Sequence, residues 1–580
     1  MKGIIIRLDA RTALQCPEFL HKSFAPNRFD LSERVSEDPI VAEYKRLGLV
    51  HEERVLDFIR KLPITRADIS RNIERVEQQR ETARALLDPS IQIILGAYIA
   101  EECELSLREK LGDIKVEDKS RVSRPDILIQ VGLSSKGFPL WAPVDIKNHG
   151  AFDEENKSNK VKISKWVEHL PENAFEVSGK LKFDDGMQLA HYYMHLSNLG
   201  IASPNYLVGV VGRDYESIVW AYLDQTKQGR GAIAPSYLSI YHKNFLEAVH
   251  IVKKSIERNQ DIDVEAPSIS KMKSGKFGCS MCEYRKICLN EMISFDAGAG
   301  HVTLLPRVTP SVAEKDFPGI ESIRELIAAG GLTDTGEKAR RRAKAWESGI
   351  PQLVEPAEPL KIPEFDIEID IDLENSQALL EEILEGDQIG DDRVYLYGYG
   401  VHDRLKNSDW RTASFEHFSN FGGTPDDEYE ILLAMWQKLN RMAEAAQKNG
   451  SSIGIFHYSS HERTWWRRFV NRFSDRPETP TLDQVENFMN QYFVDLLDYS
   501  RKVALKTTGY SIKQLAPLAG FAWSVDDAGG ANSLLKYKLA TNVSASVEDQ
   551  QNAIRWLIDY NRDDVKATFA VREYLRNLKF

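Results

Sequence analysis

Acidic and apolar residues alternate along the whole of EFDIEIDIDLEN, residues 364–375. A period of two indicates a β-strand, because successive side chains point to opposite faces of a sheet. One face of this predicted strand carries five carboxylates: Asp366, Glu368, Asp370, Asp372 and Glu374. Like charges so close repel one another, so we expect most of them to be solvated. The strand is then either an exposed sheet edge protected by charge, or a metal-binding strand whose last two acids, Asp372 and Glu374, bind divalent cations.

Later segments of the same half favour the metal-binding interpretation. YLYGYGV predicts the next strand, and SIGIFHYSSHERTWW predicts a strand that ends at His457 and is followed by Glu462. WLIDYNRDDVKATFAVREYL predicts a long helix with Tyr560 and Asp564 on one face, since positions i and i+4 lie one above the other. Asp495, in VDLLDYS, is an alternative or supporting acid.

Four segments of the first half carry potential catalytic side chains. KRLGLVHEERVLDFI predicts an amphipathic helix with His51, and RPDILIQVG predicts a turn into a strand with Asp126 at its start. WAPVDIKNHG predicts a strand in which Asp145 and Lys147 share one face, roughly 7 Å apart. A carboxylate and an ammonium on one face can hold a metal and orient a water. FDDGMQLAHYYMHL predicts a helix with two polar side chains one above the other, Gln188 and Tyr192.

Three of the five cysteines cluster in GCSMCEYRKIC with the spacing C-x2-C-x5-C: Cys279, Cys282 and Cys288. In a chain without an export signal this indicates metal binding rather than disulfide bonds. For the fourth ligand we prefer Cys16 to Cys103, which lies in a helical pattern and is expected to be a small buried side chain. A zinc knuckle or plain thiols are the alternatives. Structural zinc more often uses two paired C-x2-C knuckles, whereas four-thiolate iron–sulfur sites tolerate uneven spacing.

The pattern of the chain predicts three parts. Residues 1–300 mix helix and strand patterns, and residues 361–580 start a second such mixture. Between them, residues 301–360 are rich in proline and hold a basic run, EKARRRAKAW, which predicts a connector with one or two small helices. Two compact domains joined by a short helical region suit a length of 580 residues.

Composition excludes several classes of protein. The formal net charge of −12 argues against a mainly electrostatic coat on nucleic acid, but not against a nuclease, whose metal sites need carboxylates. No apolar run approaches the roughly 18 residues of a membrane span, and the N-terminus does not resemble a signal peptide, so we expect a cytoplasmic protein with no membrane partner. The phosphate-binding pattern G-x4-G-K-[ST] is absent, so the chain is not itself a helicase, although a helicase or another protein could act with it in trans.

The order of elements in the first half resembles the RecB-like branch of the PD-(D/E)xK nucleases. The match rests on the helix histidine, the single Asp, the Asp-x-Lys strand, the Q-x3-Y helix and the cysteines, and covers roughly residues 10–295. It implies a restriction-endonuclease-like α/β fold. It also implies a 4Fe-4S cluster that joins the two ends of the domain through Cys16, Cys279, Cys282 and Cys288.

The same resemblance implies roles for the catalytic side chains. Asp126 and Asp145 would bind Mg2+ or Mn2+, with His51 as a further ligand. Lys147 would position or activate the attacking water and offset the charge that develops on the phosphate. The two polar residues of the Q-x3-Y helix would contact the nucleic-acid backbone or steady the lysine. One departure is SRPD, which lacks a glycine that relatives often place shortly before this Asp.

The Asp-x-Glu strand, the later acid and the final Y-x3-D helix resemble the DEDD exonucleases of the RNase H-like fold. The resemblance implies that Asp372, Glu374, Glu462 and Asp564 hold two Mg2+ or Mn2+ ions and that Tyr560 positions the attacking water. Glu462 departs from the aspartate that is usual in the family.

The chain as a whole therefore resembles a RecB-like nuclease fused to an RNase H-like DEDDy exonuclease-type domain. It implies metal-dependent exonuclease cleavage of DNA, single-stranded or at ends, in DNA repair or in defence against foreign DNA. Two alternatives stay open: an RNA-processing nuclease, and a nucleic-acid-binding or scaffold protein with one inactive nuclease domain.

Basic and aromatic residues could line a groove for a single strand. RTWWRRF interleaves Trp465 and Trp466 with arginines, a combination that can stack on bases and bind phosphates. On a helix half of this segment must face the core, so we expect a tryptophan here to be core rather than platform. The basic run Lys338 to Lys344 is the other candidate, and its alternative is a solvated linker helix.

Overall fold

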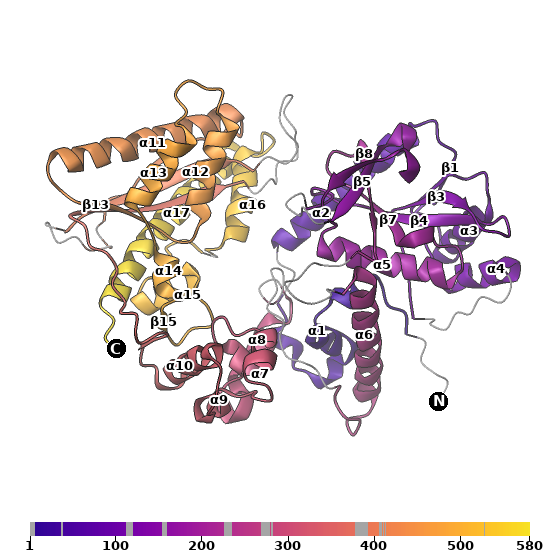
Figure 1. The fold of residues 1–580 in the computed structure, drawn as a ribbon, viewed down its shortest axis with the longest axis horizontal. Coiled ribbons are helices and arrows are strands. Elements are labelled where there is room, and N and C mark those ends of the chain that lie inside the picture. The colour runs from indigo at the N-terminus through magenta and orange to yellow at the C-terminus, as the bar shows by residue number, and fades with distance from the viewer. Residues whose placement is uncertain are drawn as a thin grey trace. The chain divides into compact units, whose positions relative to one another are not determined.

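The computed structural model describes residues 6–35, 39–111, 120–153, 159–225, 235–267, 279, 282–376, 392–404, 409, 411, 413–526 and 528–580. The chain forms two compact units, the first built mainly from residues 1–284 and the second mainly from residues 285–580. Each unit has its own sheet and its own core (Figure 1). No helix in the described ranges combines the length and the apolar character that a membrane span requires.

The first unit is built on an eight-stranded mixed sheet in the order β1-β2-β3-β4-β7-β8-β5-β6. Its strands are β1 (Arg66–Asp68), β2 (Ile93–Leu95), β3 (Ile127–Leu133), β4 (Pro139–Ile146), β5 (Lys160–Lys165), β6 (Phe175–Ser178), β7 (Leu207–Val211) and β8 (Ser217–Tyr222). Its helices are α1 (Pro17–Phe24), α2 (Pro39–Arg60), α3 (Arg75–Leu87), α4 (Glu101–Leu111), α5 (Phe183–Asn198) and α6 (Tyr237–Gln260). β4 pairs antiparallel with β3 and parallel with β7, so it lies in the middle of the sheet.

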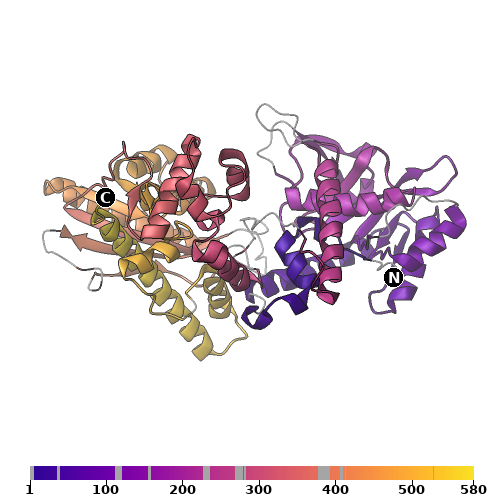
Figure 2. The ribbon, with the colours of Figure 1, turned by 90° about the horizontal axis from the view of Figure 1, so that it is seen from below.

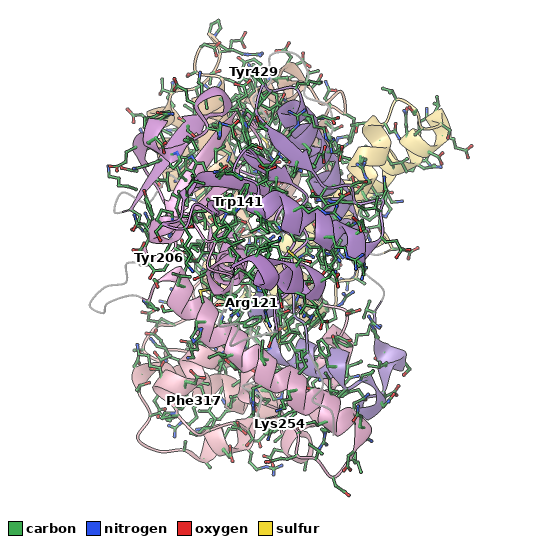
Figure 3. The ribbon with its side chains drawn as sticks, turned by 90° about the vertical axis from the view of Figure 1, so that its right-hand side faces the viewer. Arg121, Trp141, Tyr206, Lys254, Phe317 and Tyr429 are labelled. Carbon is green, nitrogen blue, oxygen red and sulfur yellow. The ribbon has the colours of Figure 1, made fainter. Side chains whose placement is uncertain are left out.

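The two faces of this sheet are covered by different helices. On one face Val208 and Val210 of β7 share a core with α5 and α6, and on the other face Val144 of β4 packs with α2. Trp141 of β4 is completely buried, and Arg121 lies over the ring of Phe245 of α6 (Figure 3). Since side chains alternate along β4, Asp145 points away from α2 and toward α5.

The helix and strand predictions for the first half are confirmed at each segment that carries a potential catalytic residue. His51 lies in α2, Asp126 directly precedes β3, and Asp145 lies in β4 with Lys147 just after its end. The helix predicted from FDDGMQLAHYYMHL is α5. Cys103, in α4, has no exposed surface and belongs to the core, as expected.

The residues expected to form a connector, 301–360, belong to the second unit. They hold three helices rather than one or two, α8 (Pro310–Asp316), α9 (Ile323–Ala328) and α10 (Asp334–Ser348), which follow α7 (Arg285–Gly298). These helices share a small core of their own. β9 (Gln352–Leu353) then pairs with β15 (Val503–Ala504), and the buried Arg342 donates from Nε to the Tyr510 hydroxyl at 3.3 Å. This pairing and packing explain why the segment is part of the second unit.

The main sheet of the second unit has five strands in the order β12-β11-β10-β13-β14. The strands are β10 (Ile367–Asn375), β11 (Val394–Asp403), β12 (Glu416–Ser419), β13 (Ile453–His457) and β14 (Phe493–Asp495). The helices are α11 (Pro425–Lys448), α12 (His461–Arg472), α13 (Leu482–Tyr492), α14 (Leu496–Ser500), α15 (Ile512–Leu515), α16 (Gly530–Thr541) and α17 (Val547–Arg576). The predicted acidic strand is β10, which pairs antiparallel with β11 and parallel with β13. The edge-strand interpretation is therefore wrong, because both of its sides are paired.

The alternation of β10 separates two kinds of packing. Its apolar residues Ile369, Ile371 and Leu373 share a core with α11, α12 and α13. Its acidic face packs against the long helix α17 on the other side of the sheet (Figure 2). The sheet thus lies between two helical layers, and the carboxylates face the one that α17 contributes.

The expectation that most of these carboxylates are solvated is wrong. Glu368 is 0% exposed and Asp370 is 2% exposed. Both form ion pairs with Arg572, and Glu368 also pairs with Arg576 at 2.7 Å. Asp366 accepts hydrogen bonds from the backbone N–H and the hydroxyl of Ser452. The sequence pattern could not show this, because the two arginines come from the end of α17, about two hundred residues further along the chain.

Candidate active sites

Three predicted acids meet where β10 ends beside α17. The ligand oxygens of Asp372, Glu374 and Asp564 all lie within 4.8 Å of one another, and we call these residues the acid triad. Asp372 and Glu374 are two residues apart on one strand and therefore share a face, and α17 brings Asp564 to them. In the described part of the chain this is the one group of three or more potential metal ligands at such short distances.

Mutual repulsion of its carboxylates makes the acid triad a candidate cation site. Burial raises the pKa of Asp372 well above its ordinary value, and the carboxylates of Asp564, Glu374 and Glu462 raise it further. Burial and the charge of Asp564 raise the pKa of Glu374 to about 8. The pKa of Asp564 is also raised by burial. Three carboxylates so close together, two of them buried and Asp372 half-buried, are costly unless a cation compensates them.

Lys513 and Trp523 are candidate site residues that the sequence did not reveal. Lys513 Nζ and Trp523 Nε1 each donate to Oδ1 of Asp564 at 2.6 Å. The Lys513 ammonium also lies over two aromatic rings, 4.1 Å from the centroid of Trp523 and 4.3 Å from that of Tyr560. A lysine in an amphipathic turn carries no signal of its own, and only its position beside the acids identifies it.

Asn561 orients the first acid of the triad. Its Nδ2 donates to Oδ2 of Asp372 at 2.7 Å. This contact requires Gly398, the residue opposite Asp372 on β11, because a Cβ added there would lie 1.9 Å from Oδ1 of Asn561. The glycine in YLYGYGV was a usable signal, since a strand-interior glycine often marks a close approach.

Glu462 lies near the acid triad, but its carboxylate is not among the ligand groups that lie within 4.8 Å of one another. It is 2% exposed, and its Oε2 lies 3.4 Å from Nδ1 of His457, at the end of β13. Its charge still contributes to the raised pKa of Asp372. The structure therefore does not gather Glu462 into the group of ligand atoms, contrary to the expectation of four clustered acids. Asp495 has a structural role, since its Oδ1 accepts from the N–H groups of Ser459 and Leu497 at 2.9 Å each.

Tyr560 lies where the resemblance implies. It is 3% exposed and stacks on Trp556, with ring centroids 5.1 Å apart. Burial and the carboxylates of the acid triad raise its pKa far above the ordinary value. Its hydroxyl therefore keeps its proton at neutral pH and can donate a hydrogen bond.

The first unit brings Asp126, Asp145 and Lys147 together. Lys147 Nζ forms an ion pair with the buried Asp145. Asp126 Oδ2 accepts from the backbone N–H of Ile146 at 2.9 Å, which places it beside Asp145. Burial raises the pKa of Asp126 well above its ordinary value, and the charges of Asp145 and Glu52 raise it further. Burial alone would lower the pKa of Lys147, but the charges of Asp145 and Asp185 bring it above the ordinary value, so the lysine stays protonated.

The two residues of α5 that were predicted to steady Lys147 are connected to it by hydrogen bonds. Lys147 Nζ donates to Oε1 of Gln188 at 2.8 Å, and Gln188 Nε2 donates to the Tyr192 hydroxyl at 2.9 Å. The sequence analysis missed Asp185, whose Oδ1 lies 3.8 Å from Lys147 Nζ. Its position three residues before Gln188 on α5 was the available signal.

Among the contacts of the described residues, His51 binds a backbone carbonyl rather than these acids. Its Nε2 donates to the carbonyl of Gly212 at 3.2 Å, and burial lowers its pKa. Among the described residues, no ligand group of three within 4.8 Å includes His51, Asp126 or Asp145. The neighbouring residue Glu52 is linked to Asp126 through Arg71, which forms ion pairs with both carboxylates, and the charge of Glu52 raises the pKa of Asp126.

Three of the four predicted cluster ligands lie in the first unit. Burial and the neighbouring Cys16 and Cys282 raise the pKa of the Cys279 thiol to about 11. The two ends of the unit also meet at an aromatic contact, because the ring centroids of Tyr284 and of Phe19, in α1, lie 5.4 Å apart. The fourth predicted ligand, Cys288, lies in α7 of the second unit.

The two candidate strand-binding segments are largely engaged within the protein. Trp465 and Trp466 are each 1% exposed and belong to the core, so neither is a stacking platform. In the basic run, Arg341 donates to the carbonyl of Val354 at 2.8 Å, and Arg342 is buried. The alternative of a solvated linker helix is therefore wrong for these two arginines.

Comparison with known families supports the assignment of the second unit. A family model described as the RNase H superfamily matches residues 385–576. The matched range contains Glu462, Tyr560 and Asp564 and begins after the acids of β10. The match suggests a nuclease-type, phosphodiester-hydrolysing function. It does not reach the first unit, whose PD-(D/E)xK assignment stays a prediction. A search of curated proteins and a search of solved structures found no match.

Proposed function

We propose that this chain is a metal-dependent nuclease whose second unit hydrolyses phosphodiester bonds of DNA as an exonuclease, on single strands or at ends. The observation that carries the proposal is the acid triad, three carboxylates with oxygens within 4.8 Å of one another. Its third member, Asp564, lies in the range 385–576 that the RNase H superfamily model matches. Repair of DNA or defence against foreign DNA is the cellular role that we propose for this activity.

The donor set of the acid triad fits Mg2+ or Mn2+. Hard divalent cations prefer oxygen ligands, and the single charge of Lys513 offsets the mutual repulsion of the three carboxylates only in part. Such an ion, when bound, polarises the phosphate and lowers the pKa of a water. The residues of the chain supply the rest. Asn561 fixes the orientation of Asp372, and the protonated Tyr560 hydroxyl is placed to orient the attacking water.

A hydrolysis assay tests this proposal. The full chain is incubated with 5′- or 3′-labelled DNA and RNA oligonucleotides, single- and double-stranded, with Mn2+ or with a chelator. We expect cleavage with Mn2+, none with the chelator, and faster cleavage of DNA than of RNA. Faster cleavage of RNA would replace the DNA assignment with an RNA-processing one. No hydrolysis of any substrate would leave a binding or scaffold protein.

We propose the first unit as a second hydrolytic centre. The observation that favours it is the chain of contacts from Asp145 through Lys147 and Gln188 to Tyr192. Because Lys147 stays protonated, it can hold the phosphate and offset charge that develops there. The same assay tests this centre, since Lys147→Ala should remove its share of the cleavage and leave that of the second unit.

We also propose that the thiols of Cys16, Cys279 and Cys282 bind a 4Fe-4S cluster, with Cys288 as the ligand predicted from sequence. Several thiols close together favour a metal, and Cys16 and Cys282 lie close enough to Cys279 to raise the pKa of its thiol. Anaerobically purified protein should contain iron and acid-labile sulfide. Cys16→Ser should lose both, whereas Cys103→Ser, which alters a thiol buried in the core, should keep both. Stoichiometric zinc without iron would refute the cluster.

A further inference from the structure

We infer that Lys513 occupies the place of a second metal ion, so that the acid triad binds one divalent cation per chain rather than two. This inference rests on the proposed function of the second unit and specifies the cation content of its site. It differs from the two-ion site that the resemblance to DEDD exonucleases implies.

The first observation is the position of the Lys513 ammonium beside the acid triad. Its Nζ lies 2.6 Å from Oδ1 of Asp564. The ligand oxygens of Asp372, Glu374 and Asp564 lie within 4.8 Å of one another, so the ammonium lies beside all three acids. An ammonium in this position supplies the compensation that a cation would otherwise supply.

The second observation is that one oxygen of Asp564 is already used twice. Lys513 Nζ and Trp523 Nε1 both donate to Oδ1. Two catalytic ions lie roughly 4 Å apart, so a second ion needs carboxylate oxygens in addition to those that hold the first. Oδ1 of Asp564 already accepts from two donors, and the Tyr560 hydroxyl hydrogen-bonds to the same carboxylate, which leaves Asp564 little capacity for a second ion.

The third observation is the net charge of the site, together with the distance of the remaining acid, Glu462. The ionised acid triad carries three negative charges and Lys513 one positive charge, so a single divalent cation balances the site before substrate binds. A second ion would need a further acid at short range. Glu462 is not among the ligand atoms within 4.8 Å, and its Oε2 faces His457 Nδ1 at 3.4 Å.

The surroundings of Lys513 hold its ammonium in place. The Nζ atom lies over the rings of Trp523 and Tyr560 at 4.1 and 4.3 Å, distances typical of cation–π contacts. The lysine side chain is 31% exposed, so a phosphate of the substrate can reach it.

Counting Mn2+ ions tests the inference. Mn2+ bound by the full chain is measured by equilibrium dialysis for the wild type, Lys513→Met, Lys513→Arg and the control Lys506→Met, which removes an exposed lysine charge. Each protein is paired with a version that also carries Asp372→Asn and Asp564→Asn. The difference within a pair counts the ions held by the acid triad, independently of any other metal in the chain.

We expect a difference of one ion for the wild type, Lys513→Arg and Lys506→Met, and of two for Lys513→Met. Electron paramagnetic resonance should show magnetically isolated Mn2+ in the first three and a coupled pair in the last. Two ions in the wild type would overturn the inference, whether or not any variant folds. One ion in a Lys513→Met protein with wild-type circular dichroism would also overturn it. No ion in the wild type would overturn the proposed metal site itself.

Discussion

Asp564→Asn is expected to slow Mn2+-dependent hydrolysis by roughly a hundredfold to ten-thousandfold in a Lys147→Ala background. The Lys147→Ala substitution removes the expected activity of the first unit, so the remaining cleavage belongs to the second unit. The substitution keeps the size of the side chain but removes the negative charge of Asp564. This charge belongs to the acid triad and also pairs with Lys513. Metal ions contribute several kcal/mol of charge stabilisation, and each 1.4 kcal/mol is about tenfold in rate.

The matched control is Asp559→Asn. Asp559 lies on the same helix and pairs at 2.7 Å with Arg562, in a partly exposed ion pair. The control should keep the rate of the Lys147→Ala protein, because surface pairs contribute little. Initial rates on labelled single-stranded DNA measure both variants. If Asp564→Asn retains the rate of its background, the acid triad is not the active site of the second unit.

Arg572→Met is expected to destabilise the second unit by about 3 to 5 kcal/mol. Arg572 has no exposed surface and pairs with Glu368 and with Asp370, the latter at 2.8 Å. Removing one partner of a buried pair leaves an uncompensated charge, which costs about that much. Arg576 still pairs with Glu368 in this variant, so Asp370 is the carboxylate that loses most of its compensating positive charge.

This loss should depend on pH. Burial raises the pKa of Asp370 to about 7, although Arg572 opposes the shift. Burial also pushes the pKa of Glu368 upward, but its hydrogen bond with Arg576 and the charges of both arginines bring it below the ordinary value. Without Arg572 both folded-state values rise. A carboxyl with a raised folded-state pKa loses stability as pH increases through that value, so the variant should be closer to wild type at pH 5 than at pH 8.

Chemical denaturation of the full chain, followed by circular dichroism, measures this effect. Arg562→Met is the control, because it removes an arginine of the same helix that is about one third exposed. The control should change the free energy of unfolding by less than about 1 kcal/mol. Equal effects of the two variants would show that the buried ion pairs do not stabilise the unit.

The sequence predicted those parts of the site that lie within single elements. The two-residue period of β10 placed Asp372 and Glu374 on one face, and helical spacing placed Tyr560 and Asp564 on one side of α17. The same local rules placed Asp145, Lys147, Gln188 and Tyr192. The resemblance then predicted which elements meet, and the acid triad agrees with that prediction for three of its four acids.

The partners that decide the charge state of each acid could not be predicted in this way. Glu368 and Asp372 are alike in sequence, two acids on one face of one strand, yet one is compensated by Arg572 and the other belongs to the acid triad. Periodicity fixes the direction of a side chain but not what lies opposite it. Lys513, Asn561 and the two arginines approach β10 from later parts of the chain, so long-range packing alone brings them to the acids. Sequence by itself therefore determined the carboxylates and their faces, and tertiary structure decided which of them lie buried in ion pairs and which three come together as a candidate cation site.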